Sequence, residues 1–261
     1  YVQLATEGGV PQALYPEGGL SVDGKLRTPK LGLFDYMLKN FDPLAERDLV
    51  FIPVGLNYDR VIEDRTLLRK LDDHAPRGSL LRTLRISVGY LSRQLMLTLS
   101  GRRYRYGYAC VNFGQPMSMR DYVKTHAIDF RKMDETARRS AVVQVGDLMM
   151  QRIGGIIPVL PVPLVATVLL RDPQRALSDL ELKAEVLDLI QAIEASGAHV
   201  YLPRTDRDYA LSVGLRMLTL RHLVEEQNGL YRANPKELLV LKYYANSITH
   251  ICEGLGKPRN S

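Results

Sequence analysis

Cysteine is scarce in this sequence, and residues that bind metals do not cluster. The two cysteines, Cys110 and Cys252, stand in apolar sequence contexts without the spacing of a metal site. They predict buried thiols in a reducing compartment rather than a disulfide framework. Because no ligand cluster exists, we expect no metal or redox cofactor. Hydrophobic residues make up 46% of the 261 positions, which excludes a disordered chain and predicts a substantial core.

A continuous transmembrane stretch is also lacking. The most apolar run, residues 153–170, is interrupted by two glycines and three prolines. A helical span needs about 20 helix-compatible apolar residues. We therefore expect an extended lead-in and then a buried helix that begins at Pro163, where proline suits a first turn. A monotopic contact of this run with lipid is the alternative.

Acidic residues are absent between His74 and Arg120, a span that holds eight arginines. Such a segment suits nucleic acid, an anionic membrane surface or an acidic cofactor such as coenzyme A. Its arginines are mixed with many leucines, a composition typical of a basic amphipathic helix in a membrane interface. We expect this helix over residues 79–100, and we expect no nucleic-acid binding. An ordinary core helix with a solvated arginine face is the alternative.

The stretch with the most chemical information is a glycine turn near the start of the sequence. It reads Tyr-Pro-Glu-Gly-Gly-Leu-Ser over residues 15–21 and follows an apolar pair, Ala13-Leu14, which we interpret as the end of a buried strand. Paired glycines let backbone N–H groups approach an anion closely. Three cations follow, at Lys25, Arg27 and Lys30. Together these features indicate a phosphate-binding corner, with a tight surface turn as the alternative.

Four motifs, in order along the chain, resemble the glycerol-3-phosphate acyltransferase family. The first is Glu17-Gly18-Gly19-x-Ser21, followed by Gly24-x-Leu26 and Pro29-Lys30-x-Gly32. The second is Phe-Ile-Pro-Val-Gly-Leu-Asn-Tyr-Asp at residues 51–59, a strand with Ile-Pro-Val and then Tyr and an acid. The third is Val-Asn-Phe-Gly-Gln-Pro at residues 111–116, and the fourth is Tyr-Tyr-Ala-Asn-Ser-Ile-Thr-His at residues 243–250. The resemblance therefore extends over nearly the whole chain.

The resemblance implies that the glycine turn binds the phosphate of glycerol 3-phosphate. The implied substrate-binding residues are Glu17, Gly18, Gly19, Ser21, Lys25, Arg27, Lys30 and Pro53. Glu17 is expected to shape the turn through hydrogen bonds, and Pro53 is expected to line the same pocket. Leu20 stands where the family has an arginine, so the acceptor stays open between glycerol 3-phosphate, dihydroxyacetone phosphate and lysophosphatidate.

The catalytic motif of the family has no counterpart in this sequence. In that motif, His-x4-Asp, a histidine deprotonates the acceptor hydroxyl while an aspartate orients the imidazole. None of the five histidines has an aspartate five positions later, and His126 with Asp129 has the wrong spacing. We therefore expect no catalytic residue here, and we expect the sequence to be the C-terminal portion of a longer enzyme, inactive alone. A non-catalytic lipid-binding scaffold is the alternative.

The order of predicted elements indicates an α/β protein with two domains. We expect residues 1–125 to form the C-terminal part of an acyltransferase domain, a mixed sheet flanked by helices that lacks its N-terminus. Residues 126–261 are expected to form a mainly helical C-terminal domain. The expected strands are residues 48–57 and 104–112, and the expected helices are residues 29–41, 64–71, 134–152, 178–197, 206–227 and 235–251.

These features and the resemblance together predict a membrane-associated O-acyltransferase of phospholipid biosynthesis. It would move a fatty acyl group from acyl-CoA or acyl-carrier protein to glycerol 3-phosphate, giving lysophosphatidate. The basic segment between His74 and Arg120 would contact the anionic membrane surface. We expect the enzyme at the cytoplasmic face of the cell membrane, bound peripherally or monotopically.

Overall fold

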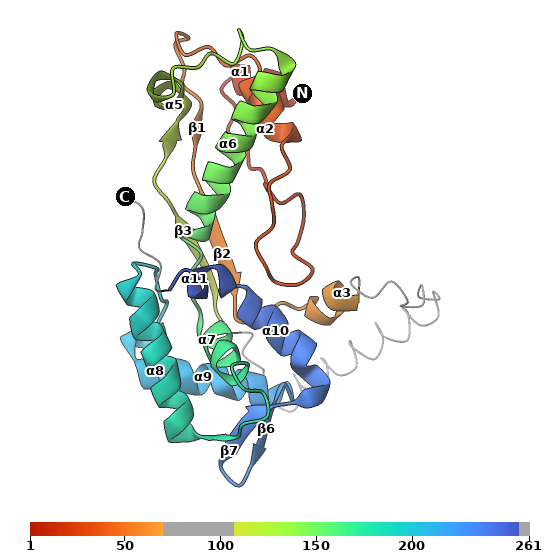
Figure 1. Ribbon diagram of the computed structural model, residues 1–261, viewed down its shortest axis with the longest axis vertical. Coiled ribbons are helices and arrows are strands. Elements are labelled where there is room, and N and C mark those ends of the chain that lie inside the picture. The colour runs from red at the N-terminus through yellow and green to blue at the C-terminus, as the bar shows by residue number, and fades with distance from the viewer. Residues whose placement is uncertain (70–106, 256–261) are drawn as a thin grey trace, which may run out of the picture.

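The computed structural model describes residues 1–69 and 107–255 of an elongated molecule. The N-terminal elements gather at one end, and most helices of the second half gather at the other (Figure 1). Helix α6 (Glu135–Gly154) runs along the long axis and connects the two ends. The helix expected over residues 79–100 lies outside the described residues.

The N-terminal end has its own hydrophobic core. Helices α1 (Val2–Glu7), α2 (Gly32–Leu38) and α5 (Met119–Thr125) surround the short antiparallel pair of β1 (Val50–Phe51) and β4 (Met117–Ser118). Phe34 and Phe51 lie with ring centroids 5.6 Å apart, and Val145 brings one face of α6 into the same cluster. The Ser118 hydroxyl caps α5 by accepting the Asp121 N–H at 3.0 Å.

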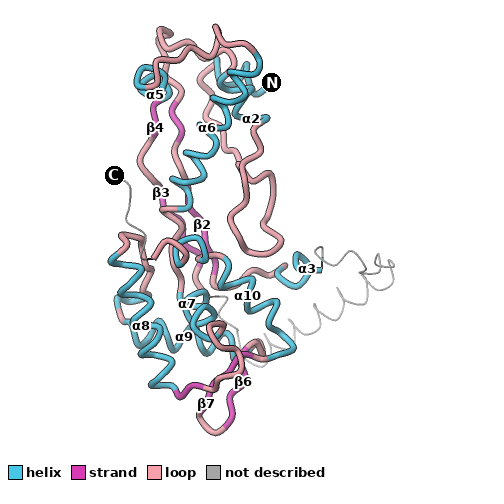
Figure 2. The backbone as a smooth tube through the Cα atoms, in the orientation of Figure 1, coloured by secondary structure: helices cyan, strands magenta, loops and turns pink. Residues whose placement is uncertain are grey.

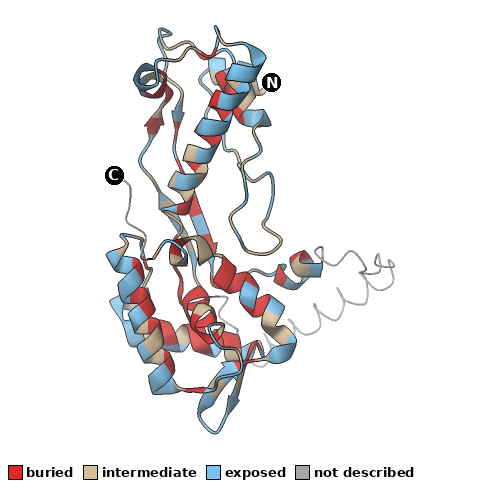
Figure 3. Cartoon of the chain, in the orientation of Figure 1, coloured by how far each residue is buried: buried red, intermediate tan, exposed pale blue. Residues whose placement is uncertain are grey.

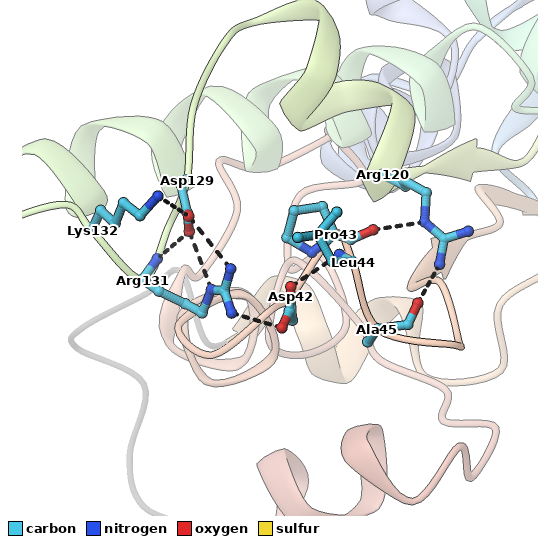
Figure 4. A network of polar contacts seen from close by, with 8 residues as sticks. All are labelled: Asp42, Pro43, Leu44, Ala45, Arg120, Asp129, Arg131 and Lys132. Atoms are coloured by element: carbon cyan, nitrogen blue, oxygen red, sulfur yellow. Dashed lines mark hydrogen bonds and ion pairs between the residues drawn. The ribbon is translucent and has the colours of Figure 1, made fainter.

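Arginine side chains attach the loop after α2 to this core (Figure 4). The Arg120 guanidinium donates to the carbonyls of Pro43 and Ala45 at 3.0 and 2.8 Å. Arg131 forms an ion pair with Asp42 at 2.7 Å. Arg120, the last arginine of the basic segment, therefore stabilises a loop of the protein itself.

Strands β2 (Val54–Tyr58) and β3 (Ala109–Phe113) form the antiparallel pair at the middle of the molecule. Pro53 separates β1 from β2, as expected for a residue that cannot donate to a ladder. Burial alternates along β2, so one face of this strand is buried and the other is exposed. Gly55 faces inward, where an added Cβ would lie 2.8 Å from the carbonyl oxygen of Ile156.

The second core surrounds α7 (Pro161–Leu169), whose residues are nearly all buried (Figure 3). Helices α8 (Asp179–Ala195), α9 (Arg207–Leu220) and α10 (Leu238–Asn246) pack around it. Helix α7 begins at Pro161, two positions before the predicted start, and Ser178 with Glu181 forms a capping box at the start of α8. Within the described residues, no helix is both long and apolar enough to cross a membrane.

Two short helices complete the described chain. Helix α3 (Asp64–Arg69) packs on α10 and confirms the short helix predicted over residues 64–71. Helix α11 (Thr249–Cys252) follows α10 after a break at Ser247–Ile248. The predicted last helix, residues 235–251, is therefore divided into a 3₁₀ turn and two helices.

Two element predictions are wrong. Helix α9 ends at Leu220, and the last residues of the predicted helix form β6 (Val224–Gln227), which pairs with β7 (Leu230–Ala233) around an Asn228-Gly229 turn. Both turn residues have positive φ, 54° and 75°, as a two-residue hairpin requires. With β5 (Leu177–Ser178) they make a three-stranded antiparallel sheet in the half predicted to be mainly helical. The pair Ala13-Leu14, expected to end a strand, lies in a loop.

The fold class is mixed α and β, as the order of elements predicted. The described ladders are the pairs β1–β4 and β2–β3 and the sheet β5–β7–β6, all antiparallel. The acyltransferase-type mixed sheet and the division between residues 125 and 126 stay predictions.

Candidate functional site

The predicted phosphate-binding turn lies in a long loop between α1 and α2, which we call the glycine-rich loop (residues 15–31). The loop contains no helix or strand and extends beside α6 toward α10 (Figure 2). Its two ends are joined, because the Lys30 N–H donates to the carbonyl of Pro16 at 2.7 Å. The Gly18 N–H donates to the carbonyl of Tyr15 at 2.9 Å and closes the turn. The sequence therefore folds here into a closed loop rather than a strand with a turn.

Gly18 allows the Lys30 side chain to pass close to the loop backbone. Its φ of +71° favours glycine, and an added Cβ would lie 2.4 Å from Lys30 Cδ and 3.0 Å from Lys30 Nζ. No atom lies within 4 Å of the corresponding position at Gly19, so that side of the turn is open. The structure thus brings together the two glycines and one predicted cation.

Glu17 connects the two arms of the loop. Burial raises the pKa of its carboxyl above the usual value, while the backbone N–H and the guanidinium of Arg27 favour the charged form. The carboxylate accepts a hydrogen bond from that Arg27 N–H. Glu17 therefore interacts with Arg27 across the loop, and its expected role in shaping a phosphate-binding turn stays a prediction.

Ser21 braces the loop tip. Its hydroxyl lies 2.8 Å from the carbonyl of Lys25 and 3.1 Å from Asp23 Oδ1. The Lys25 N–H donates to the same Asp23 oxygen at 3.0 Å. These contacts use the Ser21 hydroxyl and the Asp23 carboxylate within the loop, while the side chains of Lys25, Arg27 and Lys30 remain exposed.

The tip of the loop is docked on α10. The Asn246 side chain donates to the carbonyl of Asp23 at 2.7 Å. Gly24 has a φ of +85°, and an added Cβ would lie 2.0 Å from the carbonyl oxygen of Tyr243. Two of the four motifs, the first and the fourth, therefore meet at this contact.

Pro53 lies elsewhere. It is buried between β1 and β2, and its carbonyl accepts the Gly114 N–H at 2.9 Å. An added Cβ at Gly114 would lie 2.9 Å from Pro53 Cγ. Among the described residues, no hydrogen bond joins Pro53 to the glycine-rich loop. Its expected place in the same pocket stays a prediction.

Sequence reasoning missed the segment on which the motifs converge, residues 154–158. Its alternate carbonyls, those of Gly154, Ile156 and Pro158, each lie within hydrogen-bond distance of a motif side chain. These side chains are His250 at 3.1 Å, Asn112 at 2.9 Å and Asn57 at 2.9 Å. We call residues 154–158 the clamped segment. The three polar residues stood in the recognised motifs, but nothing in the sequence indicated their common partner.

His250 has one ring nitrogen without a partner. Because Nε2 faces the carbonyl oxygen of Gly154, we assign the hydrogen to Nε2 and leave Nδ1 as an acceptor. Nδ1 is buried and has no hydrogen-bond partner within the described part of the chain. Burial lowers the pKa of His250, so the ring is neutral near pH 7.

A cavity of about 500 Å³ adjoins the glycine-rich loop. Leu26 and Arg27 of the loop form one wall, the end of α6 with Gly155 another, Ala198 a third, and His250 with Ile251 the last. The lining is mostly apolar, and no aspartate or glutamate belongs to it. Within the described ranges, no group of three or more histidine, cysteine, aspartate or glutamate side chains is placed to hold a metal ion.

Two buried carboxylates lie behind this site. Asp64 Oδ2 accepts from Tyr244 Oη and from Arg221 Nη2, both at 2.5 Å, and joins α3 to α9 and α10. Asp59 accepts the N–H groups of Val162 and Tyr108, each at 3.0 Å, at the start of α7. Burial raises the pKa of Asp59 to about 6 despite those two bonds. These contacts position elements rather than face the cavity.

Comparison with known proteins gives a consistent result. The sequence model described as "Glycerol-3-phosphate acyltransferase C-terminal region" matches residues 93–252. A glycerol-3-phosphate acyltransferase of Pseudomonas fluorescens Pf-5 is 27% identical over 96% of this chain, and one of Pseudomonas syringae pv. syringae is 27% identical over 93%. The chain spans about 30% of the length of these curated relatives.

Proposed function

Because this chain belongs to the glycerol-3-phosphate acyltransferase family, whose C-terminal region it matches, we propose that it binds substrate in a membrane-associated O-acyltransferase. The acceptor is glycerol 3-phosphate, and the donor is acyl-CoA or acyl-carrier protein. The acceptor's primary hydroxyl oxygen attacks the thioester carbonyl carbon, so that a C–O bond forms and the C–S bond breaks. The thiol leaves with the hydroxyl proton, and the product is lysophosphatidate.

The observation that carries this proposal is the closed glycine-rich loop. Its two acids, Glu17 and Asp23, accept hydrogen bonds from backbone N–H groups of the same loop. Its three cations, Lys25, Arg27 and Lys30, are exposed. A loop whose acids are used internally and whose cations face solvent is suited to a phosphate monoester.

We assign this region to substrate binding rather than to proton transfer. None of its histidines has the spacing of the family's His-x4-Asp motif. Burial lowers the pKa of His250, and its Nε2 donates a hydrogen bond to the Gly154 carbonyl oxygen. The deprotonation of the acceptor hydroxyl is therefore assigned to no residue of this chain.

Association with the membrane is proposed for the cytoplasmic face, through the basic segment from His74 to Arg120. The Arg120 guanidinium already donates hydrogen bonds to two loop carbonyls. The seven other arginines, which lie outside the described residues, carry the proposal.

The test is an acyl-transfer assay on the protein as the cell makes it, in membranes, with acyl-CoA and labelled glycerol 3-phosphate. A Glu17→Ala variant should lose most of the lysophosphatidate formed, because Arg27 loses its carboxylate partner. A Glu46→Ala variant, at an exposed glutamate outside the glycine-rich loop, is the matched control and should keep its activity. No turnover of any acceptor by the unaltered protein would contradict the enzyme proposal and favour a lipid-binding scaffold.

Dihydroxyacetone phosphate and lysophosphatidate are run as parallel acceptors, because Leu20 replaces the family's arginine. Leu20 is exposed at the turn. Because its side chain is apolar, it can supply neither a hydrogen bond nor a charge to a phosphate there. Preference for another acceptor over glycerol 3-phosphate would overturn the assigned substrate and keep the reaction class.

A further inference from the structure

We propose that the cavity between the glycine-rich loop, α6 and α11 binds the hydrocarbon chain of an acyl ligand whose head group carries phosphate. The choice of ligand class rests on the proposed function. Acyl-CoA and 1-acylglycerol 3-phosphate share this chemistry, since each joins one long acyl chain to a phosphate-bearing head. The cations of the loop bind the head group, and the apolar walls bind the chain.

The size and lining of the cavity suit an alkyl chain. Its volume of about 500 Å³ lies within the range of about 300–1,000 Å³ that small-molecule sites occupy. Leu26 and Ile251 supply apolar walls from opposite sides, and three glycines of the lining contribute no side chain that would fill the space. An alkyl chain in this cavity would be removed from water, and it has no polar groups that would be buried without a partner.

The charge at the cavity wall suits an anionic head group. Arg27 is exposed and also lines the cavity, so its guanidinium borders both the solvent and the apolar space. Lys25 and Lys30 extend the positive charge along the same loop. Because the lining holds no carboxylate, a ligand with an anionic head and a neutral chain meets no charge repulsion at the cavity wall.

His250 adds a polar residue to the cavity wall. Its ring lines the cavity, while its Nδ1 is buried and makes no contact with the cavity space.

Binding is measured on the 261-residue chain by isothermal titration calorimetry. Octanoyl, decanoyl and dodecanoyl forms of both ligand classes are compared with coenzyme A and glycerol 3-phosphate alone. We expect the affinity to rise about fourfold for each methylene that enters the cavity. The class with the tighter binding at equal chain length identifies the source of the ligand.

Two cavity-filling variants test the location. A Cβ at Gly155 would have only ordinary contacts, the nearest at 3.6 Å, so Gly155→Leu fits the backbone and narrows the cavity. Ala198→Leu narrows it from the wall after α8. Each should weaken dodecanoyl binding at least about tenfold while leaving binding of the bare head groups unchanged.

Matched controls separate this effect from loss of folding. Gly32→Leu adds the same side chain at a helical glycine with nothing within 4 Å, and Ala192→Leu adds it at an exposed position of α8. Both controls should bind as the unaltered chain does, and circular dichroism should give all four variants the same spectrum.

The inference is overturned if affinity does not depend on chain length, or if folded Gly155→Leu and Ala198→Leu bind dodecanoyl ligands as well as the controls do. Its failure is distinguishable from failure of the proposed function. Chain-length-dependent binding without turnover of any acceptor contradicts only the enzyme proposal. Turnover of glycerol 3-phosphate with unaltered binding by both variants contradicts only the cavity.

Discussion

The side chain of Asn246 donates to the backbone carbonyl of Asp23 at 2.7 Å, across 223 positions of sequence. This hydrogen bond holds the tip of the glycine-rich loop on α10. Asn246 is buried, so its replacement leaves the Asp23 carbonyl without its protein donor. We expect Asn246→Ala to lower the free energy of unfolding by about 1–3 kcal/mol. Urea denaturation measures the change, and Asn40→Ala, at an exposed asparagine, should have a negligible effect.

Gly24 should be the least replaceable glycine of the loop. Its φ is +85°, and an alanine Cβ would lie 2.0 Å from the Tyr243 carbonyl oxygen, so the loop tip must move away from α10. We expect Gly24→Ala to expose the loop to limited proteolysis. Gly32→Ala, at a position open within 4 Å, is the matched control. Equal cleavage rates in the two variants would contradict the docking contact.

Lys30 should contribute to acceptor binding more than to stability. Its side chain is exposed and passes over Gly18. We expect Lys30→Ala to raise the KM for glycerol 3-phosphate about tenfold, through loss of a charge-assisted contact with phosphate. The melting temperature should change little. Lys39→Ala, at an exposed lysine of the α2 terminus, should keep the original KM, and an unchanged KM in Lys30→Ala would remove this lysine from the site.

Tyr244 should matter for stability rather than for chemistry. Its hydroxyl donates to Asp64 at 2.5 Å and accepts from Arg221 at 2.6 Å and from the Val61 N–H at 3.2 Å. Burial raises the pKa of this hydroxyl, so it stays protonated as a donor. We expect Tyr244→Phe to lower the free energy of unfolding by about 1–3 kcal/mol. Tyr36→Phe, at an exposed tyrosine, provides the comparison, and equal stability of both variants would contradict the network.

Asp59 should make the folded state less stable as pH rises, which is the opposite of the usual effect of an aspartate. Its folded pKa of about 6 exceeds the ordinary 3.8, so folding favours the protonated carboxyl. The resulting stabilisation is complete below pH 3.8 and is lost as pH rises through 6. The total is about 3 kcal/mol in order of magnitude.

Unfolding of the unaltered chain and of Asp59→Asn, measured between these pH values, isolates that contribution. As pH rises, the unfolding free energy of the unaltered chain should fall relative to that of Asp59→Asn. Asp188→Asn, at an exposed aspartate, should show no such shift. A constant difference for Asp59→Asn would show that the carboxyl does not titrate in this window.

Local chemistry made the helices predictable. Ser118 and Ser178 each accept the backbone N–H three positions later, and Pro53 interrupts the ladder between β1 and β2, all as the residue types require. The hairpin at Asn228-Gly229 was also visible in principle, since Asn-Gly is the preferred two-residue turn. It was missed because the helix predicted for α9 was extended to Gln227 and so covered the first strand of the hairpin.

The site was predictable only as a set of residue types. Glu17, Gly18 and the cations were named from the glycine turn and the resemblance, and their role in phosphate binding stays a prediction. The contacts of Gly24 with Tyr243 and of His250 with Gly154 join residues that are distant in sequence. A single sequence carries no signal for such pairs, because neither hydrophobic period nor turn chemistry specifies a partner across the fold.

The clamped segment has a consequence for the order in which the molecule folds. Its hydrogen bonds join residues 101 positions apart for Asn57 with Pro158, 44 for Asn112 with Ile156 and 96 for His250 with Gly154. Closing such long loops is entropically unfavourable until other contacts have brought their ends together. We expect strand pairing of β2 with β3 and docking of α11 to bring these ends together before the clamp forms. The cavity wall at Gly154 and Gly155 would then be assembled after both cores.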